Sequence, residues 1–170
     1  MNADTAELRT ERLVLRRPVA EDLDAVHEVH GDPATNRYNP SGPTSLEQSR
    51  QLLTDWIAHW ERHGFGYWTV LRAEDGAVLG FGGLRHKDLD GEAVLNLYYR
   101  FSPRAWGQGY ALEVAKAAIE FGRRPGGPPV VALINQTNEP SRRVAERAGL
   151  VATDIIEYEG AHSPVYRLPG

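Results

Sequence analysis

The chain has 170 residues, a formal charge of −4 and no cysteine. This length suits one domain, residues 1–170, with a substantial core, and the missing cysteines exclude disulfides, thiolate metal sites and a cysteine nucleophile. The acidic balance argues against nucleic-acid binding, and no apolar run approaches a signal core or a membrane span, so we expect a cytoplasmic protein that binds neither membranes nor nucleic acid.

Hydrophobic periodicity and turn residues predict alternating strands and helices. Leu13 and Leu15 lie on one face of an alternating strand. Ser45 and Gln48 form a capping box at the start of a long helix, and the turn EDGA marks a hairpin. In chain order, the predicted elements are a strand at 11–18, helices at 20–31 and 44–64, a hairpin over 66–86, a strand at 92–101, a helix at 109–122, a strand at 130–135, a helix at 138–149 and a closing hairpin over 150–170.

The order of these elements predicts a mixed α/β (α+β) fold. Helices inserted between strands require at least one parallel crossover. We therefore expect a mixed sheet of about seven strands with flanking helices, rather than a helix bundle or a sandwich.

Two glycines stand where a helix is about to begin, in SPRAWGQGYALEVAKAAIEFG, residues 102–122. A helix start presents free N–H groups and roughly half a positive charge, and Gly107 and Gly109 would let an anion approach that backbone. The segment therefore predicts a diphosphate cradle. Leu112 occupies the place of the third glycine of the dinucleotide fingerprint, and no Gly-Lys-Ser/Thr follows. A turn that needs only flexible backbone is the alternative.

This segment, followed by NEPSRRVAERAGL at 138–150, resembles the GNAT superfamily of acyl-CoA-dependent N-acetyltransferases and is most similar to the RimJ/RimL type. In that branch, Pro-x-x-Trp-Gly-x-Gly-Tyr-Ala stands for the general Gln/Arg-x-x-Gly-x-Gly/Ala motif, and Asn-x-x-Ser begins the next helix. Trp106, Gly109 and Ala111 match the first motif, and Asn138 and Ser141 match the second. The resemblance spans nearly the whole chain.

The resemblance implies a GNAT fold, a strongly bent sheet whose fourth and fifth strands, at 95–101 and 130–135, splay apart. Pantetheine is expected in the gap, paired with the open edge of the fourth strand, and the pyrophosphate on the N–H groups of residues 106–111. Acetyl-CoA or CoA is the implied co-substrate, with no metal. The residues expected to bind it are Tyr99, Arg100, Phe101, Trp106, Gly107, Gln108, Gly109, Tyr110, Ala111, Asn138 and Ser141.

Attack of a neutral amine on a thioester needs an oxyanion donor, a route for the amine proton and stabilisation of the leaving thiolate. The resemblance places the donor in the backbone N–H of Arg100 or Phe101 and the Ser141 hydroxyl near the CoA sulfur. The alternative for Ser141 and Asn138 is that they only cap their helix. Asn96 stands about where related sequences carry a glutamate, and we include it among the catalytic residues.

The base is left open by the sequence. Asn96 cannot accept a proton, Glu92 shares its strand parity, and a water relay is an equal alternative. An amine with a pKa near 8 needs less help than a lysine near 10.4, which favours an α-amine acceptor.

Several further residues have more than one interpretation. His59 and His63 lie one helical turn apart but lack the third ligand of a zinc site, so we expect a helix surface. Arg37 and Tyr38 lie in the loop that, by analogy, borders the acceptor site. The aromatic candidates for that site, which are more often core residues, are Trp56, Trp60, Tyr67 and Trp68.

These observations predict an N-acetyltransferase that transfers an acetyl or other acyl group from acetyl-CoA to a primary amine of a small molecule or a protein N-terminus, by direct attack in a ternary complex. The alternative function is an acyl-CoA-binding module with little or no turnover, which Asn96 keeps open. The acceptor and the acyl chain length are not identified. Homodimers are frequent among similar proteins.

Overall fold

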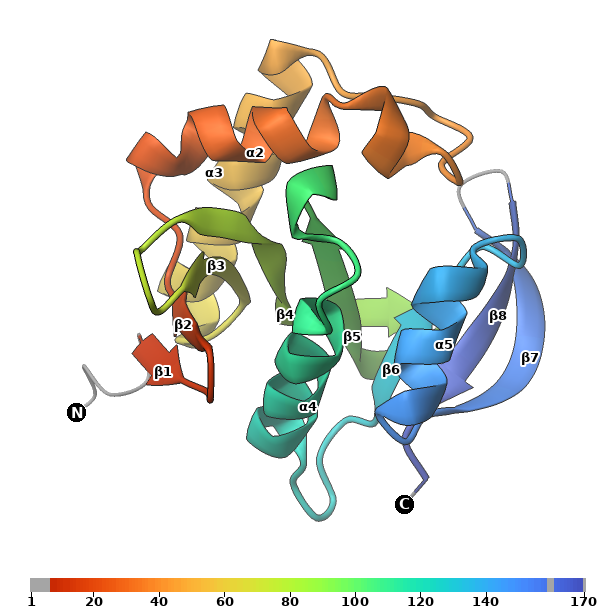
Figure 1. Cartoon of the computed structure of the whole chain (residues 1–170). Helices are drawn as coiled ribbons and strands as arrows, with labels where there is room; N and C mark the ends of the chain where they lie inside the picture. Colours follow the sequence, from red (N-terminus) through yellow and green to blue (C-terminus); the bar gives the residue numbers. More distant parts are fainter. Residues whose placement is uncertain (1–6, 159–160, 170) are drawn as a thin grey trace.

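The computed structural model describes residues 7–158 and 161–169. An eight-stranded sheet runs through it in the order β1-β2-β3-β4-β5-β6-β8-β7 (Figure 1). Neighbouring strands are antiparallel except β5 and β6, which are parallel, so the predicted mixed sheet is confirmed. The strands are β1 (Glu7–Arg9), β2 (Leu13–Arg16), β3 (Tyr67–Arg72), β4 (Val78–Leu89), β5 (Glu92–Phe101), β6 (Val130–Leu133), β7 (Val151–Tyr158) and β8 (Ala161–Arg167).

The sheet differs from the predicted one in having an eighth strand. This strand, β1, has three residues, too few for alternation to show, and it pairs with β2. The predicted closing hairpin is present as β7 and β8, while its turn at 159–160 lies outside the described residues.

Helices cover both faces of the sheet, with α4 and α5 on one side and α2 and α3 on the other (Figure 1). The capping box predicted at the start of α3 is confirmed, because Gln48 N–H donates to Ser45 Oγ at 3.1 Å and Ser45 N–H donates to Gln48 Oε1 at 2.9 Å. The helices are α2 (Leu23–His30), α3 (Leu46–His63), α4 (Tyr110–Gly122) and α5 (Glu139–Arg147), with 3-10 turns η1 (Ala20–Asp22), η2 (Pro33–Asn36) and η3 (Pro103–Ala105).

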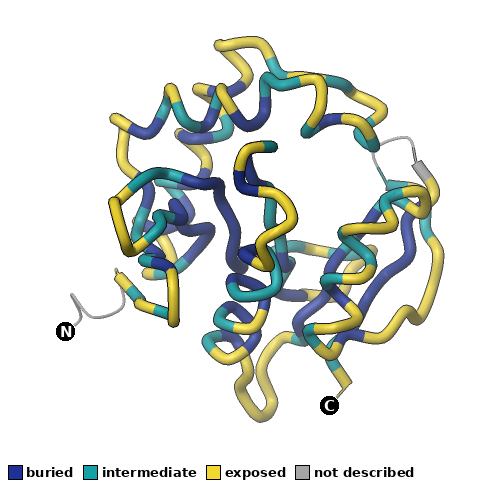
Figure 2. The backbone as a smooth tube through the Cα atoms, viewed as in Figure 1, coloured by how far each residue is buried: buried dark blue, intermediate teal, exposed yellow. Residues whose placement is uncertain are grey.

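The buried residues form a core on each face, and the central strands are the most buried part of the tube in Figure 2. On one face, α4 packs Val114, Ala115 and Ala118 against the strands. On the other, residues of α2 and α3, including Val26 and Trp56, pack on the sheet. Within the described residues, no helix is both long enough and apolar enough to cross a bilayer.

The predicted splay lies between β5 and β6. These strands pair at only two positions, Leu95 with Val130 and Asn96 with Val131, although β5 continues to Phe101. Beyond that point the chain after β6 stays with β8, because Ile134 N–H donates to the Pro164 carbonyl at 3.3 Å. The second half of β5 therefore has an edge that β6 does not cover.

Candidate functional site

The backbone of β5 has two sides, and hydrogen bonds show which residues face which side. Leu95 N–H donates to the Pro129 carbonyl, on the β6 side, whereas Ser102 N–H donates to the Leu79 carbonyl of the β4 side, both at 2.9 Å. Because these directions alternate along a strand, odd-numbered residues of β5 present N–H and C=O groups toward β6 and even-numbered residues present them toward β4.

This alternation separates the two amides expected to serve as oxyanion donors. Phe101 N–H faces the splay, together with the amides of Leu97 and Tyr99. Arg100 N–H faces β4 instead, so it is turned away from the opening. The Phe101 carbonyl accepts a hydrogen bond from the Trp106 indole at 2.9 Å. An uncovered edge of this kind can pair with an extended ligand.

The glycine loop follows directly on this edge. Gly107 and Gly109 adopt φ values of 77° and 81°, and Gly109 is the N-cap of α4. A Cβ at Gly107 would meet no atom within 4 Å, and one at Gly109 would meet only Arg12 Nη2, at 3.5 Å. Glycine is therefore required at both positions by the left-handed backbone conformation, and not by crowding around a Cβ atom.

The start of α4 keeps its backbone donors accessible. No side chain caps this helix within the described residues, so its first N–H groups are available to an anion. Trp106 N–H, by contrast, donates to the Pro103 carbonyl at 3.1 Å. Of the N–H groups expected to hold the pyrophosphate, those of residues 107–111 therefore remain candidates. The side chain of Tyr110 is buried in the core, so only its backbone faces this site.

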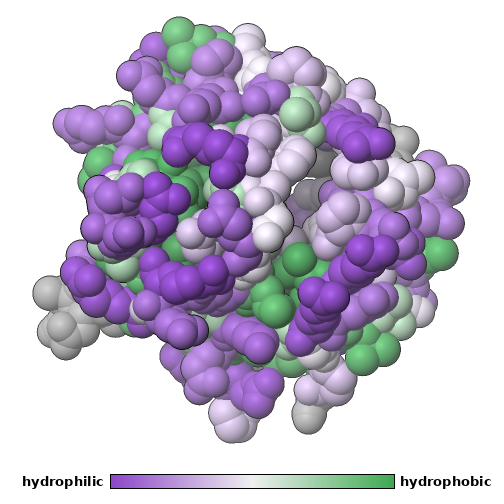
Figure 3. Space-filling model, in the orientation of Figure 1, coloured by the Kyte–Doolittle hydropathy of each residue, from purple (hydrophilic) through white to green (hydrophobic). Residues whose placement is uncertain are grey.

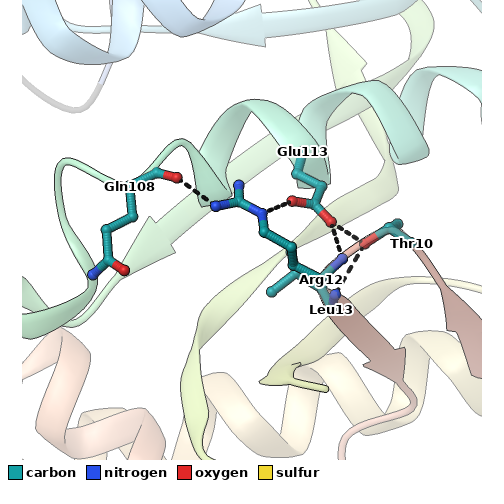
Figure 4. A network of polar contacts seen from close by, with 5 residues as sticks. All are labelled: Thr10, Arg12, Leu13, Gln108 and Glu113. Carbon is teal, nitrogen blue, oxygen red and sulfur yellow. Dashed lines mark hydrogen bonds and ion pairs between the residues drawn. The ribbon is translucent and has the colours of Figure 1, made fainter. Parts of the chain in front are cut away.

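A polar network joins the glycine loop to the turn between β1 and β2 (Figure 4). Arg12 donates from Nη1 to the Gln108 carbonyl and from Nε to Glu113 Oε1, both at 2.8 Å. Its guanidinium also lies 4.5 Å from the centre of the Tyr110 ring. Thr10 Oγ1 and the Arg12 N–H donate to Glu113 Oε2. We call this set the Arg12–Glu113 network.

The Arg12–Glu113 network places a cation beside the start of α4 and holds the loop in shape. Burial alone would raise the pKa of Glu113, but the hydrogen bonds from Thr10 and Arg12 outweigh burial, and the pKa is lowered. Sequence reasoning missed this network because its partners lie about a hundred residues apart, where no local pattern connects them.

Ser141 lies across the splay from β5. The Tyr99 hydroxyl donates to the Ser141 carbonyl at 2.8 Å, which joins the open edge to the first turn of α5. Burial raises the pKa of Tyr99 above its usual range, and hydrogen bonding with Ser141 partly offsets this effect. Figure 3 shows the surface hollowed between the end of β5 and α5.

The cap of α5 comes from Asn138, whose Oδ1 accepts the Ser141 N–H at 3.2 Å. The Asn138 side chain therefore caps α5, as the alternative for this residue predicted. For Ser141, the cap uses the backbone N–H and not the hydroxyl.

The loop between α2 and α3 contacts both sides of the splay. Asn36 Oδ1 accepts from Arg100 Nη1 at 3.3 Å on β5, and the Tyr38 carbonyl accepts from Asn135 Nδ2 at 2.6 Å, just after β6. Arg37 is exposed beside them. This arrangement puts the loop at the border of the splay, where the acceptor site was expected.

Asn96 belongs to a pocket on the face of β5 that carries even-numbered side chains. Its Nδ2 donates to the Tyr67 hydroxyl at 2.9 Å. The pocket has a volume of about 290 Å³, and we call it the β4–β5 pocket. Its lining residues are Tyr67, Arg85, His86, Lys87, Asn96 and Tyr158.

Of the four aromatic candidates for an acceptor pocket, only Tyr67 lines this one. Trp60 and Trp68 are buried in the main core, and Trp56 is buried in the second core cluster against Tyr67. The sequence did not predict the other pocket residues Arg85, Lys87 and Tyr158, because only the strand register and the β7–β8 hairpin bring them together.

Glu92, the alternative carboxylate base, is paired elsewhere. Both of its oxygens accept from the Arg167 guanidinium, at 2.7 and 3.1 Å. The Arg167 hydrogen bond lowers the pKa of Glu92, whereas a general base at neutral pH needs a pKa nearer 7. This pairing disfavours Glu92 as the base.

His59 is buried, so the predicted helix surface is wrong at this position, while His63 is exposed as predicted. The His59 face of α3 packs on β4, where Nε2 accepts the His86 N–H at 3.0 Å and Nδ1 bonds the Phe65 carbonyl at 2.9 Å. Both ring nitrogens are thus occupied. In residues 7–158 and 161–169, no group of three or more His, Cys, Asp or Glu side chains is placed to hold a metal ion.

Known proteins resemble this chain in sequence and in fold. The model of the "Acetyltransferase (GNAT) domain" matches residues 12–151. The Bacillus subtilis protein YkkB is 33% identical over 156 residues, which cover 88% of this chain and 87% of YkkB.

Solved structures share the fold. An acetyltransferase from Agrobacterium tumefaciens has a TM-score of 0.83 at 27% identity, covering 96% of this chain and 94% of that one. RimL, a ribosomal L7/L12 alpha-N-protein acetyltransferase solved with coenzyme A, has a TM-score of 0.71 at 20% identity, with 93% of each chain covered. The chain therefore belongs to the GNAT acetyltransferase family, whose activity is acyl transfer from acetyl-CoA.

Proposed function

We propose that this protein transfers the acetyl group of acetyl-CoA to a primary amine, of a small molecule or a protein N-terminus, by direct attack in a ternary complex. The proposal rests on one observation, which is that the uncovered edge of β5 leads directly into the glycine loop and the uncapped start of α4. An extended chain with a diphosphate at one end fits such a path. The similarity to RimL, an alpha-N-protein acetyltransferase, supports protein N-termini among the acceptors.

In this proposal, the N–H groups of residues 107–111 bind the pyrophosphate, with the Arg12 cation beside them. Trp106 contributes its side chain, which is half exposed and fixed by its bond to the Phe101 carbonyl. Asn138 supports the site by capping α5. The Arg100 amide has no part in binding, because it belongs to the β4 ladder.

The thioester carbonyl would lie against the open edge of β5. One of the two amides of Tyr99 and Phe101 donates to the carbonyl oxygen as negative charge develops on it, and the other bonds the pantetheine chain. The sulfur is assigned a place beside Ser141, whose backbone carbonyl is joined to this edge by the Tyr99 hydroxyl. A C–N bond forms, the C–S bond breaks, and the thiolate leaves with help from the Ser141 hydroxyl.

The amine proton passes to water in this scheme. Asn96 cannot accept a proton, and Glu92 is paired with Arg167. An α-amine with a pKa near 8 is partly neutral at pH 7 and needs no carboxylate base. Asn96 would instead orient the acceptor through the amide that bonds Tyr67.

Thiol release from acetyl-CoA across a panel of amines tests the function, and a chain without cysteine contributes no thiol of its own. We expect release that depends on the amine and yields an acetylated product. Tight CoA binding without release from any amine would favour the alternative, an acyl-CoA-binding module that has lost turnover.

A further inference from the structure

The β4–β5 pocket is positively charged, in a chain whose formal charge is −4. Two of its six lining residues, Arg85 and Lys87, carry positive side chains on this face, and none of the six is a carboxylate. The ring of His86, between them in sequence, packs on the other side of β4 against His63 and Phe65. Within the described part of the chain, neither Arg85 nor Lys87 has an ion-pair partner within 4.0 Å. Two neighbouring cations without an ion-pair partner can form a site for an anion.

The register places these cations next to the splay. Arg85 pairs with Asn96 and Lys87 pairs with Val94, so both side chains lie on the face that carries Asn96. Asn96 also forms the last β5–β6 pair, and the open edge begins at the next residue. Tyr99 stands three residues further on, about 10 Å away at 3.3 Å per residue. At up to about 3.6 Å per residue, a peptide of about three residues spans that distance, and a single amino acid spans it only together with the reach of the long Arg85 or Lys87 side chain.

Aromatic rings hold the two cations in place. Lys87 Nζ lies 4.8 Å from the centre of the Tyr158 ring, and the Arg85 guanidinium lies 5.8 Å from that of Tyr67. A ring face orients a cation while leaving its N–H groups free to bond a carboxylate. Asp88 points to the opposite face of β4 and accepts the Gly91 N–H at 2.6 Å, so it does not neutralise Lys87.

We propose that Arg85 and Lys87 bind a carboxylate of the acceptor, so that the substrate is an amino acid or a short peptide with an acidic group close to its amine. This inference rests on the proposed function, of which it names the substrate class. The pocket volume of about 290 Å³ lies at the small end of ligand sites and suits a group of amino-acid size.

The first test compares kcat/KM for matched acceptors: glutamate with glutamine and aspartate with asparagine, each free and at the N-terminus of an amide-capped dipeptide with alanine. We expect the acidic member of each pair to be preferred by about 10- to 100-fold, the range of a charge-assisted hydrogen bond. The free and capped arms separate amino acids from peptides. Equal kcat/KM values within both pairs would overturn the inference.

Variants of the pocket test whether it causes any preference for acidic acceptors. R85Q and K87Q should each lower the acid preference about tenfold or more. The matched control is K116Q, which removes the same charge as K87Q from an exposed site on α4. An acid preference that survives both pocket variants, with unchanged melting temperatures, contradicts the assignment.

A binding measurement separates this inference from the proposed function. N-acetylglutamate and N-acetylglutamine, the two acetylated products, are titrated while the NMR amide signals of residues 85–87 and 96 are followed. We expect the acid to bind at least tenfold more tightly and K87Q to remove this difference. Selective acid binding without acetylation of any amine would keep the anion site and refute the proposed function. Acetylation of amines with no selective binding would refute only the anion site.

Discussion

Gly109 meets two demands at one residue. Its φ of 81° is strained for any residue with a side chain, and its N–H belongs to the row that begins α4. Ser141 combines an observed role with a proposed one, because its backbone N–H completes the cap of α5 while its hydroxyl is proposed to help the thiolate leave. Substitutions at both residues therefore need controls that separate stability from function.

Gly109→Asp should weaken CoA binding by tenfold or more, because a carboxylate would stand where the pyrophosphate is expected. Left-handed strain should cost about 1 kcal/mol of stability. Gly126→Asp is the matched control: its φ is 78°, and a Cβ there meets nothing within 4 Å. Calorimetry should show similar destabilisation in both variants and loss of CoA affinity only in Gly109→Asp. Equal CoA affinities would reduce the glycine to a turn residue.

Ser141→Ala should lower kcat about tenfold, with CoA affinity and melting temperature nearly unchanged. The effect is modest because a thiol with a pKa of about 8.5 leaves as the thiolate without a proton. Asn138→Ala removes the cap and should cost about 1 kcal/mol of stability while the folded fraction keeps its kcat. Measuring kcat and melting temperature on both variants decides the roles, and an unchanged kcat in Ser141→Ala removes Ser141 from catalysis.

At the scale of elements, the site depends on how β5 and α4 are held. β5 pairs with β4 at ten positions but with β6 at only two positions. The start of α4 is fixed from outside its own segment, through the Arg12–Glu113 network (Figure 4). The cradle thus depends on a turn near the N-terminus of the chain.

Arg12→Ala should weaken CoA binding, because it removes both a bond to the Gln108 carbonyl and a cation beside the pyrophosphate site. Arg12 is 43% exposed, so we expect an effect of about 1–2 kcal/mol, or up to some thirtyfold in Kd. Arg50→Ala, which breaks an exposed ion pair on α3, is the control. A lowered melting temperature with an unchanged Kd would show that Arg12 supports only the fold.

At the scale of the whole molecule, two buried histidines link stability to pH. His30 is the last residue of α2 and faces β5, with Nε2 bonded to the Tyr98 hydroxyl, and burial lowers its pKa to about 3. Burial also lowers the pKa of His59, to about 4. Both values lie below the 6.5 of an unfolded histidine, so the unfolded chain binds more protons and acid favours unfolding.

The melting temperature should therefore stay constant above about pH 6.5 and fall as the pH is lowered below this value. At pH 5, each histidine would cost about 2 kcal/mol by linkage. His59→Gln should flatten the slope between pH 6.5 and 5, and His63→Gln, at an exposed position of the same helix, should leave it unchanged. A melting temperature that stays constant down to pH 5 would contradict this assignment.

The mixed sheet and the glycine turn before α4 could be predicted because their signals are local. Periodicity marked the strands and helices, and the closely spaced Gly107 and Gly109 marked the loop. What escaped prediction depends on long-range register. The turn of Arg100 toward β4, the burial of His59 against β4 and the meeting of Arg85 with Tyr158 all follow from which strands pair, which no short stretch of sequence records.

The central claim is that the uncovered edge of β5 and the glycine loop together bind acetyl-CoA. Amide hydrogen exchange, resolved by residue with and without CoA, tests this claim most directly. We predict that CoA slows exchange at Tyr99 and at residues 107–111, while Tyr98 and Arg100, already in the β4 ladder, do not change. Unchanged exchange at Tyr99 and the glycine loop, at a CoA concentration shown by calorimetry to saturate the protein, would contradict it.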